Sequence, residues 1–312
     1  LCQSTGSDQA YLLNSGAEAC EGAIKLARKW GQLHRNGAYQ IITASQSCHG
    51  RTLGALSASD PSPCNRCEPG LPGFSKVPFN DLEALHAAVD SSTVAIMLEP
   101  IEGEAGVIPA TAAYLKGVER LCRELGILLI LDEVQTGVGR CGALLAEQTY
   151  DVRADIITLG KGLGGGVPLA ALLARGSACC AEAGELEGSH HGNALMSAAG
   201  LAVLETVLEP GFLEHVQDAG RHLRDGLSRL SGRYGQSEIR GQGLLWALQL
   251  SEDNAGELVK AALQEGLLLN ARQPDVLRLS PALTVSKGNS DEMLLRLARA
   301  FARVHSAQQH LR

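Results

Sequence analysis

The stretch Ile127-Leu128-Leu129-Ile130-Leu131-Asp132-Glu133 decides the fold class, because an unbroken aliphatic run ends there in two carboxylates. A strand that is apolar at every position is buried on both faces, which is typical of a parallel sheet covered by helices. Similar short runs recur at residues 11–13, 41–43, 94–98, 156–159 and 169–173. Longer amphipathic segments separate them, including residues 16–30 and 112–125, and these segments are predicted to be helices. The chain is therefore predicted to be an α/β protein with a mostly parallel sheet.

The pattern changes in the last third of the chain. A helical run from residue 196 leads to Pro210, and mixed helix and strand follow, with a candidate strand at residues 243–248. We therefore predict a large domain over residues 1–205 and a smaller α+β domain over residues 206–312.

Composition excludes several classes of protein. The formal net charge of −7 disfavours a nucleic-acid partner, which selects for basic surfaces. No apolar stretch is long enough to span a bilayer, and the first residues do not form a signal peptide. The nine cysteines have no framework spacing, which indicates a reducing compartment and a cytoplasmic protein. Because Leu1 is not an initiator methionine, we expect the chain to begin inside a longer sequence.

Polar residues follow four of the apolar runs. They are Asn14-Ser15-Gly16, Glu99-Pro100, Asp132-Glu133 and Gly160-Lys161. Ligands of open α/β sheets bind beyond the carboxyl ends of the strands, so these residues are predicted to surround one crevice.

Each of these residues has a structural and a functional interpretation. Ser15 and Glu18 have the spacing of a capping box, and the same helix start is suited to bind a phosphate. Lys161 is either an exposed loop lysine or, among its surrounding glycines, a nucleophile toward a carbonyl group. Asp132 either caps a turn or faces the protonated ring nitrogen of a pyridine cofactor.

Two other motifs are weaker. The glycine-rich loop lacks the Gly-Lys-Ser/Thr order of a nucleotide-binding P-loop, because Gly162 follows Lys161. Cys64 and Cys67 have the spacing of a zinc knuckle, but no second pair follows at a fitting distance, so we expect no metal.

Five motifs follow one another along the chain. They are Asn14-Ser15-Gly16-Ala17-Glu18-Ala19, His49-Gly50-Arg51-Thr52, Glu99-Pro100-Ile101-Glu102-Gly103-Glu104, Leu131-Asp132-Glu133-Val134-Gln135-Thr136-Gly137 and Gly160-Lys161-Gly162-Leu163-Gly164-Gly165-Gly166. Together they resemble the class III aminotransferases, in order and spacing, across essentially the whole chain. The subgroup indicated is the acetylornithine/ornithine aminotransferases of bacterial arginine metabolism, which residues 266–270 and 277–283 also support.

The resemblance implies the pyridoxal 5′-phosphate (PLP)-dependent transferase fold type I and assigns the residues around the cofactor ring. Lys161 would hold PLP as a Schiff base and would then carry the proton between the substrate and the cofactor. Asp132 would pair with the pyridinium nitrogen. Val134 would pack on one face of the ring, and Gln135 would lie near its hydroxyl group. Cys48 and His49 would complete the cofactor site.

The resemblance also implies how the phosphate and the second subunit contribute. Ser15, Gly16 and Ala17 would hold the phosphate through backbone N–H groups and the Ser15 hydroxyl. Ser189 would reach the phosphate bound by the other subunit of a homodimer, whose active sites are shared.

Substrate binding is implied for three further residues. Arg51 and Arg278 would bind substrate carboxylates through the bidentate geometry of the guanidinium group. Glu104 would pair with Arg278 when the bound amine lacks a second carboxylate. A single pocket could then accept both glutamate and an ω-amino donor.

The resemblance therefore implies transfer of the ω-amino group of N2-acetylornithine, or a close relative, to 2-oxoglutarate, with glutamate as a product. The alternatives are a 4-aminobutyrate- or ornithine-type ω-aminotransferase, a PLP aminomutase, or a catalytically impaired remnant of the fold.

The chain departs from the family pattern at several positions. Cys48 stands where an aromatic residue usually stacks on the ring, which implies weaker cofactor binding. Glu102 replaces a glutamine and is expected to add negative charge near the pocket. Residues 193–195 and 139–142 carry local loop changes, and the family has a further segment ahead of the position of Leu1.

Overall fold

The computed structural model describes residues 1–60, 69–235 and 238–309, which form two compact units. Unit 1 consists of Leu1–Glu102, Ala110–Gly139 and Ala143–Pro210. Unit 2 consists of Gly103–Pro109, Arg140–Gly142 and the chain from Gly211 onward. The pair Cys64 and Cys67 lies outside the described residues.

Unit 1 is built on a seven-stranded sheet with the order β1-β9-β8-β7-β4-β2-β3. The pairs β2–β3, β2–β4, β4–β7 and β7–β8 are parallel, whereas β9 runs antiparallel to both of its neighbours. The predicted mostly parallel sheet of an α/β fold is therefore confirmed. Strand β3 (Phe74–Val77) was not predicted, because only Val77 of this edge strand is buried.

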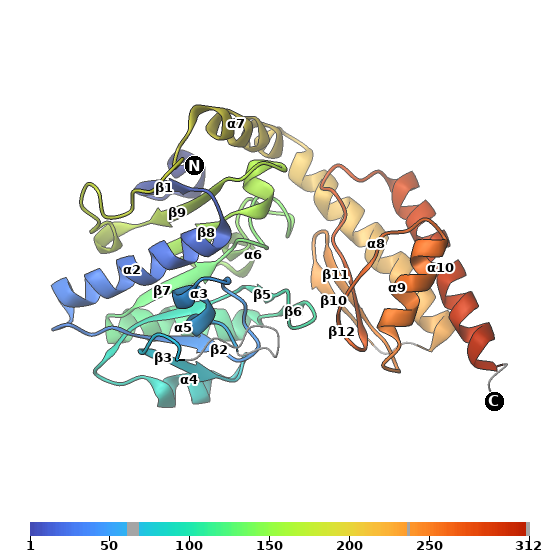
Figure 1. Ribbon diagram of the computed structural model, residues 1–312, viewed down its shortest axis with the longest axis horizontal. Coiled ribbons are helices and arrows are strands. Elements are labelled where there is room, and N and C mark those ends of the chain that lie inside the picture. Colours follow the sequence, from blue (N-terminus) through green and yellow to red (C-terminus); the bar gives the residue numbers. More distant parts are fainter. Residues whose placement is uncertain (61–68, 236–237, 310–312) are drawn as a thin grey trace. The chain divides into compact units, whose positions relative to one another are not determined.

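Helix α2 (Gly16–His34) covers one face of this sheet (Figure 1). Its apolar side, which includes Ile24, Leu26 and Trp30, is buried in the same core cluster as strand residues such as Ile130. The helix begins at a complete capping box, in which Ser15 Oγ accepts from Glu18 N–H and the Glu18 carboxylate accepts from Ser15 N–H. The start of α2 is thereby fixed relative to the strand that precedes it.

The carboxyl ends of β1, β4, β7 and β8 lie at one edge of the sheet, because these four strands run in the same direction. Asn14, Glu99, Asp132 and Lys161 stand at these ends. The topology thus brings to one edge the polar residues that the sequence placed after separate strands.

Unit 2 contains an antiparallel four-stranded sheet with the order β10-β11-β13-β12. Helices α8 (Phe212–Tyr234), α9 (Ala255–Gln264) and α10 (Lys287–Gln309) share one core with this sheet. The helices contribute Leu223 and Leu297 to it, and the sheet contributes Leu248 and Leu277. Unit 2 thus combines helices with an antiparallel sheet. The strand predicted at residues 243–248 is observed as β11 (Leu245–Gln249).

The elements have the following bounds. The helices are α1 (Cys2–Thr5), α2 (Gly16–His34), α3 (Leu53–Ala58), α4 (Leu82–Ala88), α5 (Ala112–Leu125), α6 (Glu147–Tyr150), the 3-10 helices η2 (Lys161–Gly164) and η3 (Gly176–Ala178), α7 (Ala194–Leu208), α8 (Phe212–Tyr234), α9 (Ala255–Gln264) and α10 (Lys287–Gln309). The strands are β1 (Gln9–Leu13), β2 (Gln40–Ala44), β3 (Phe74–Val77), β4 (Thr93–Leu98), β5 (Ile101–Glu102), β6 (Ile108–Pro109), β7 (Leu128–Asp132), β8 (Ile156–Leu159), β9 (Ala170–Ala174), β10 (Glu238–Gln242), β11 (Leu245–Gln249), β12 (Asn270–Gln273) and β13 (Val276–Leu279).

Within the described part of the chain, no single helix has the length and apolar character needed to cross a membrane; only α7 and α8 taken together, as a bent pair, meet that criterion.

Candidate active site

Asp132 is the buried centre of the candidate site in unit 1. Its side chain ends strand β7 and is 4% exposed. Oδ1 accepts hydrogen bonds from the Thr158 hydroxyl at 2.9 Å and from Val134 N–H at 3.1 Å. A carboxylate buried this deeply needs such donors, because burial without partners penalises its charge.

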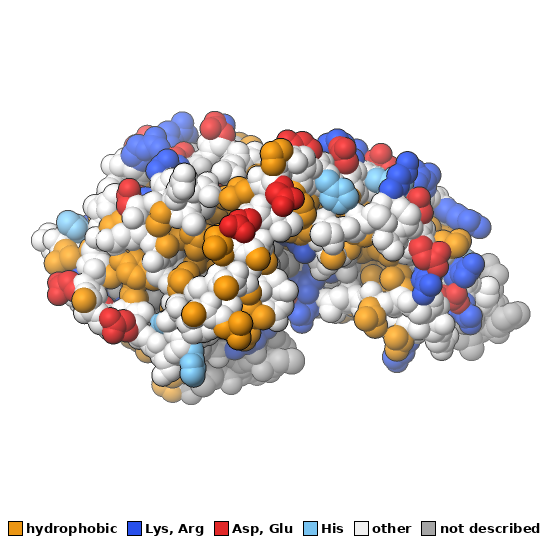
Figure 2. All heavy atoms as spheres, turned by 90° about the horizontal axis from the view of Figure 1, so that it is seen from above, with side chains coloured by type: hydrophobic (Ala, Val, Ile, Leu, Met, Phe, Trp, Pro, Cys, Tyr) orange, Lys and Arg blue, Asp and Glu red, His pale blue; other side chains and the backbone are white. Residues whose placement is uncertain are grey.

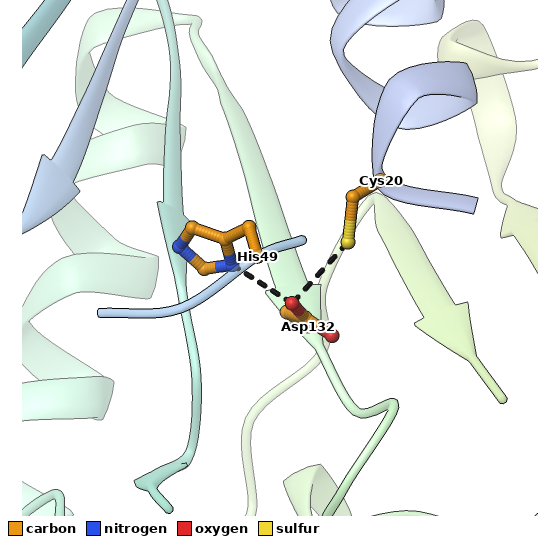
Figure 3. A group of neighbouring side chains, drawn as sticks. All are labelled: Cys20, His49 and Asp132. Carbon is orange, nitrogen blue, oxygen red and sulfur yellow. Dashed lines mark hydrogen bonds and ion pairs between the residues drawn. The ribbon is translucent and has the colours of Figure 1, made fainter. Parts of the chain in front are cut away.

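The second oxygen of Asp132 contacts His49 and Cys20. His49 Nδ1 lies 2.8 Å and Cys20 Sγ 3.3 Å from Oδ2. Figure 3 shows the three side chains pointing toward one another from α2, from the loop after β2 and from the end of β7. The atoms Sγ, Nδ1 and Oδ2 lie within 4.8 Å of one another, a spacing that could also hold a metal ion. The hydrogen-bond distances describe a cluster in which Asp132 is the common acceptor.

The charges of this cluster follow from its contacts. Burial opposes ionisation of Asp132, but the hydrogen bond from His49 and the charge of His49 outweigh it, so the pKa of Asp132 is lowered. Burial disfavours protonated His49, yet the hydrogen bond and charge of Asp132 raise its pKa above the ordinary value. Burial, reinforced by the Asp132 charge, raises the pKa of Cys20 well above its usual value. Asp132 is therefore an ionised acceptor, and Cys20 is a neutral thiol that donates.

Lys161 stands directly after strand β8 and begins the 3-10 helix η2. Its backbone has φ of 40°, in the left-handed region that residues with a Cβ rarely adopt. Its Nζ donates a 2.8 Å hydrogen bond to Gln135 Oε1. Strained backbone of this kind occurs where the surrounding structure fixes a functional side chain. The structure thus brings Lys161 and Gln135 together, two residues that the resemblance assigns to one cofactor site.

The helix start at Ser15 leaves donors for an anion. The Ser15 N–H is occupied by the Glu18 carboxylate, so it is not available to a phosphate. The N–H groups of Gly16 and Ala17 belong to the first turn of α2, which cannot satisfy them within the helix, and no side chain in the described residues accepts from them. Together with the Ser15 hydroxyl proton, these two groups are donors at a helix start, a place suited to an anion.

Close packing around Gly16 requires glycine there. A Cβ added to Gly16 would lie 2.6 Å from Val134 Cγ1, and one added to Gly160 would lie 3.3 Å from Gly16 Cα. Val134, Gly16 and Gly160 therefore bring the helix start, the end of β7 and the end of β8 into contact. A larger residue at position 16 would push Val134 away from the position predicted for the ring face.

The loop after β2 carries Cys48 and Arg51. Cys48 N–H donates to Glu99 Oε2 at 3.0 Å, and the exposed Arg51 donates to Cys48 Sγ at 2.9 Å. Burial raises the pKa of Glu99 to about 8; the His49 charge opposes this shift and the Asp132 charge adds to it. Glu99 therefore acts here as a largely neutral support for the Cys48 backbone at pH 7.

Ser189 lies on an exposed loop of unit 1. Its carbonyl oxygen accepts from Asn14 Nδ2 at 2.9 Å, so the loop is tied to the residue just before the helix start. The hydroxyl group predicted to reach a partner's phosphate is thus carried by a segment that is bonded to the residue just before the helix start of α2.

Glu104 and Arg278 meet in unit 2. Glu104 Oε1 lies 2.8 Å from Arg278 Nη1. Arg272, which the sequence interpretation missed, holds the other oxygen through its Nε at 3.0 Å. Arg272 lies at an irregularity in the β12–β13 register, and Arg278 Nε is buried without a partner among the described residues. Arg278 is therefore neutralised while keeping a spare donor.

Glu102 does not add the negative charge that was expected. Its side chain, at the end of β5, is 1% exposed, and Oε1 has no partner in the described part of the chain. Burial, with a smaller effect of Asp60, raises the pKa of Glu102 to about 8. The carboxyl group is thus mostly protonated at pH 7, and the expectation is wrong because burial outweighs solvation of the charge.

Comparisons with known proteins agree with this geometry. The family model described as aminotransferase class III matches residues 1–301. The chain therefore belongs to the class III aminotransferases, a family of PLP-dependent enzymes, and the resemblance seen in its motifs is confirmed.

Individual relatives extend this result. Acetylornithine aminotransferase 2 of Bordetella parapertussis is 50% identical over 301 residues, which cover 95% of this chain and 76% of that protein. The structure of ornithine aminotransferase from Toxoplasma gondii ME49 has a TM-score of 0.92 and 32% identity, covering 98% of this chain and 75% of that one. N-acetylornithine aminotransferase from Stenotrophomonas maltophilia K279a has a TM-score of 0.84 and 36% identity, covering 98% and 78%. Fold type I is thereby confirmed.

The described residues fit PLP. An ionised, buried Asp132 is suited to keep a pyridine nitrogen protonated. The helix start at Gly16 and Ala17 is suited to the phosphate. The close contact between Gly16 and Val134, which a Cβ at position 16 would break, holds this turn beside the end of β7. Lys161 offers an amine, which donates a hydrogen bond to Gln135.

Proposed function

We propose that this chain transfers the ω-amino group of N2-acetylornithine to 2-oxoglutarate. When bound, PLP supplies an aldehyde that accepts the amino group and a ring that serves as an electron sink. The single observation that carries the choice of an ω-amino donor is the Glu104–Arg278 ion pair at 2.8 Å. It neutralises a guanidinium group that an amine-bearing substrate would otherwise leave unpaired. The 50% identity to an acetylornithine aminotransferase supports the same choice.

The proposal gives each site residue a task. Lys161 holds the cofactor and moves a proton at the substrate carbon that bears the amino group, with Gln135 orienting its Nζ. Asp132 keeps its charge toward the ring nitrogen, and Val134 supports the ring face. Ser15, Gly16 and Ala17 bind the phosphate.

The remaining residues bind the substrate. Arg51 binds one carboxylate of the substrate. Arg278 binds the second carboxylate of 2-oxoglutarate or glutamate after Glu104 releases it.

A panel of amino donors tests this function. With 2-oxoglutarate as acceptor, we expect kcat/KM for N2-acetylornithine to exceed that for ornithine and 4-aminobutyrate by about tenfold or more, the equivalent of one well-formed polar contact. Glutamate formation measures amino transfer, and consumption of the amino donor measures any turnover without 2-oxoglutarate. Turnover that continues without 2-oxoglutarate would indicate an aminomutase, and a preference for 4-aminobutyrate would contradict the proposed donor.

We also propose a homodimer with shared active sites in a reducing, cytoplasmic compartment. Helix α7 leaves Leu195 (73% exposed), Leu201 and Leu208 in solvent, and Figure 2 shows apolar side chains gathered over this part of unit 1. An exposed apolar patch of this kind supports a protein partner, and a second copy is the simplest one. The free thiols of the described residues support the compartment. Light scattering is expected to give twice the chain mass, and a monomer at micromolar concentration would exclude the dimer.

A further inference from the structure

Cys20 connects the two ends of the cofactor site through one helix. It lies on α2 four residues after Gly16, about 6 Å along the axis at 1.5 Å per residue. Its side chain is fully buried, and Sγ is 3.3 Å from Asp132 Oδ2 and 3.7 Å from Thr158 Oγ1. The helix that begins at the phosphate-binding turn thus also contacts the carboxylate proposed for the ring nitrogen.

The direction of the Cys20 hydrogen bond is fixed by the neighbouring groups. An ionised carboxylate only accepts, so the thiol must donate to Asp132. The Thr158 hydroxyl gives its own proton to Asp132 Oδ1 at 2.9 Å, and the single thiol proton goes to Oδ2, so the 3.7 Å contact between Cys20 Sγ and Thr158 Oγ1 is a packing contact beside these two bonds. Both oxygens of Asp132 are then held, Oδ1 by Thr158 and Val134, and Oδ2 by His49 and Cys20. Rotation of the carboxylate would break at least one of these bonds.

We propose that Cys20 is a positioning residue for PLP, because its thiol holds the Asp132 carboxylate in the orientation offered to the ring nitrogen. Through α2, the position of Asp132 is then coupled to the phosphate-binding turn at Gly16 and Ala17. This inference rests on the proposed role of Asp132 toward the cofactor. Cys20 does not contact the reacting atoms. An apolar residue in its place would remove one hydrogen-bond donor to Asp132.

The experiment compares Cys20→Ala with Cys20→Ser and uses Cys122 as a matched control. Cys122 is also buried, and the hydrogen bond of its thiol within the described residues goes to the Leu128 carbonyl, at 3.8 Å, and not to Asp132. The dissociation constant of PLP is measured by removing the cofactor from each enzyme and titrating the apoenzyme with PLP. Thermal unfolding is recorded without PLP. Cys122→Ala reproduces the loss of a buried sulfur and its packing, whereas only the Cys20 variants change a donor to Asp132.

We expect Cys20→Ala to raise the PLP dissociation constant about fivefold, the effect of losing one hydrogen bond to a buried acceptor. Cys20→Ser retains an O–H donor and should remain within about twofold of the wild type by the same reasoning. Cys122→Ala should lower the unfolding temperature without changing PLP affinity. Equal PLP affinity of Cys20→Ala and wild type, or of Cys20→Ala and Cys20→Ser, would overturn the proposal. Absence of PLP binding in the wild type would instead overturn the proposed function, and the inference with it.

Discussion

Lys161→Ala is expected to lower kcat for glutamate formation by about 10⁴-fold, the upper range for loss of a positioned proton-transfer group. The same change should abolish covalent attachment of PLP, because it removes the amine that is expected to form the covalent bond. The strained backbone supports this expectation: φ of 40° is maintained at a residue whose side chain reaches Gln135 at 2.8 Å. Alanine also carries a Cβ, so it keeps the same backbone strain, and the folded structure should persist.

The measurement combines mass spectrometry after borohydride reduction with steady-state rates. Wild type should carry one reduced cofactor on the peptide that contains Lys161, and Lys161→Ala should carry none. Lys260→Ala is the control, because Lys260 is an exposed lysine on α9 of unit 2. It should retain wild-type rates and labelling. The assignment fails if Lys161→Ala keeps more than about a hundredth of the wild-type activity, because the expected loss is about 10⁴-fold. It also fails if the label appears on another lysine.

The fold could be predicted from hydrophobic patterning because its central strands are buried on both faces. The run that leads to Asp132 is apolar at every strand position before that residue, and it lies in the middle of the sheet as β7. Strand β3 was missed because an edge strand buries few side chains and therefore leaves a weak pattern. The position of Lys161 after β8 follows from the same logic as that of Asp132, since both end parallel strands.

The contacts within the site were less predictable than its residues. Cys20 shows no sign in the sequence of contacting Asp132, because that contact depends on how α2 packs across the sheet. Arg272 contacts Glu104 only because the β12–β13 register shifts beside it, and a register irregularity leaves no mark in composition. The charge of Glu102 could not be predicted either, since it depends on burial by segments distant in sequence.

Glu102→Gln is expected to stabilise the protein at neutral and alkaline pH. The folded state holds the Glu102 proton up to a pKa of about 8, whereas the unfolded chain releases it near the ordinary value of 4.5. Folding above pH 4.5 therefore requires uptake of a proton, and the cost grows until about pH 8 and is constant beyond it. Glutamine is a neutral group of the same shape and avoids this cost. At 1.36 kcal/mol per pKa unit, the gain at pH 7 is on the order of 3 kcal/mol.

Urea unfolding of the PLP-saturated enzyme at several pH values measures this effect. The midpoint of Glu102→Gln should exceed that of wild type at pH 8.5, and the difference should shrink as the pH falls toward 5, at an unchanged slope. Glu124→Gln is the control, because Glu124 is exposed on α5 and its replacement should change the free energy of unfolding by less than about 0.5 kcal/mol at any pH. A pH-independent difference for Glu102→Gln would mean that its carboxyl group is ionised in the folded state. Glu102 would then add negative charge to unit 1 despite its burial.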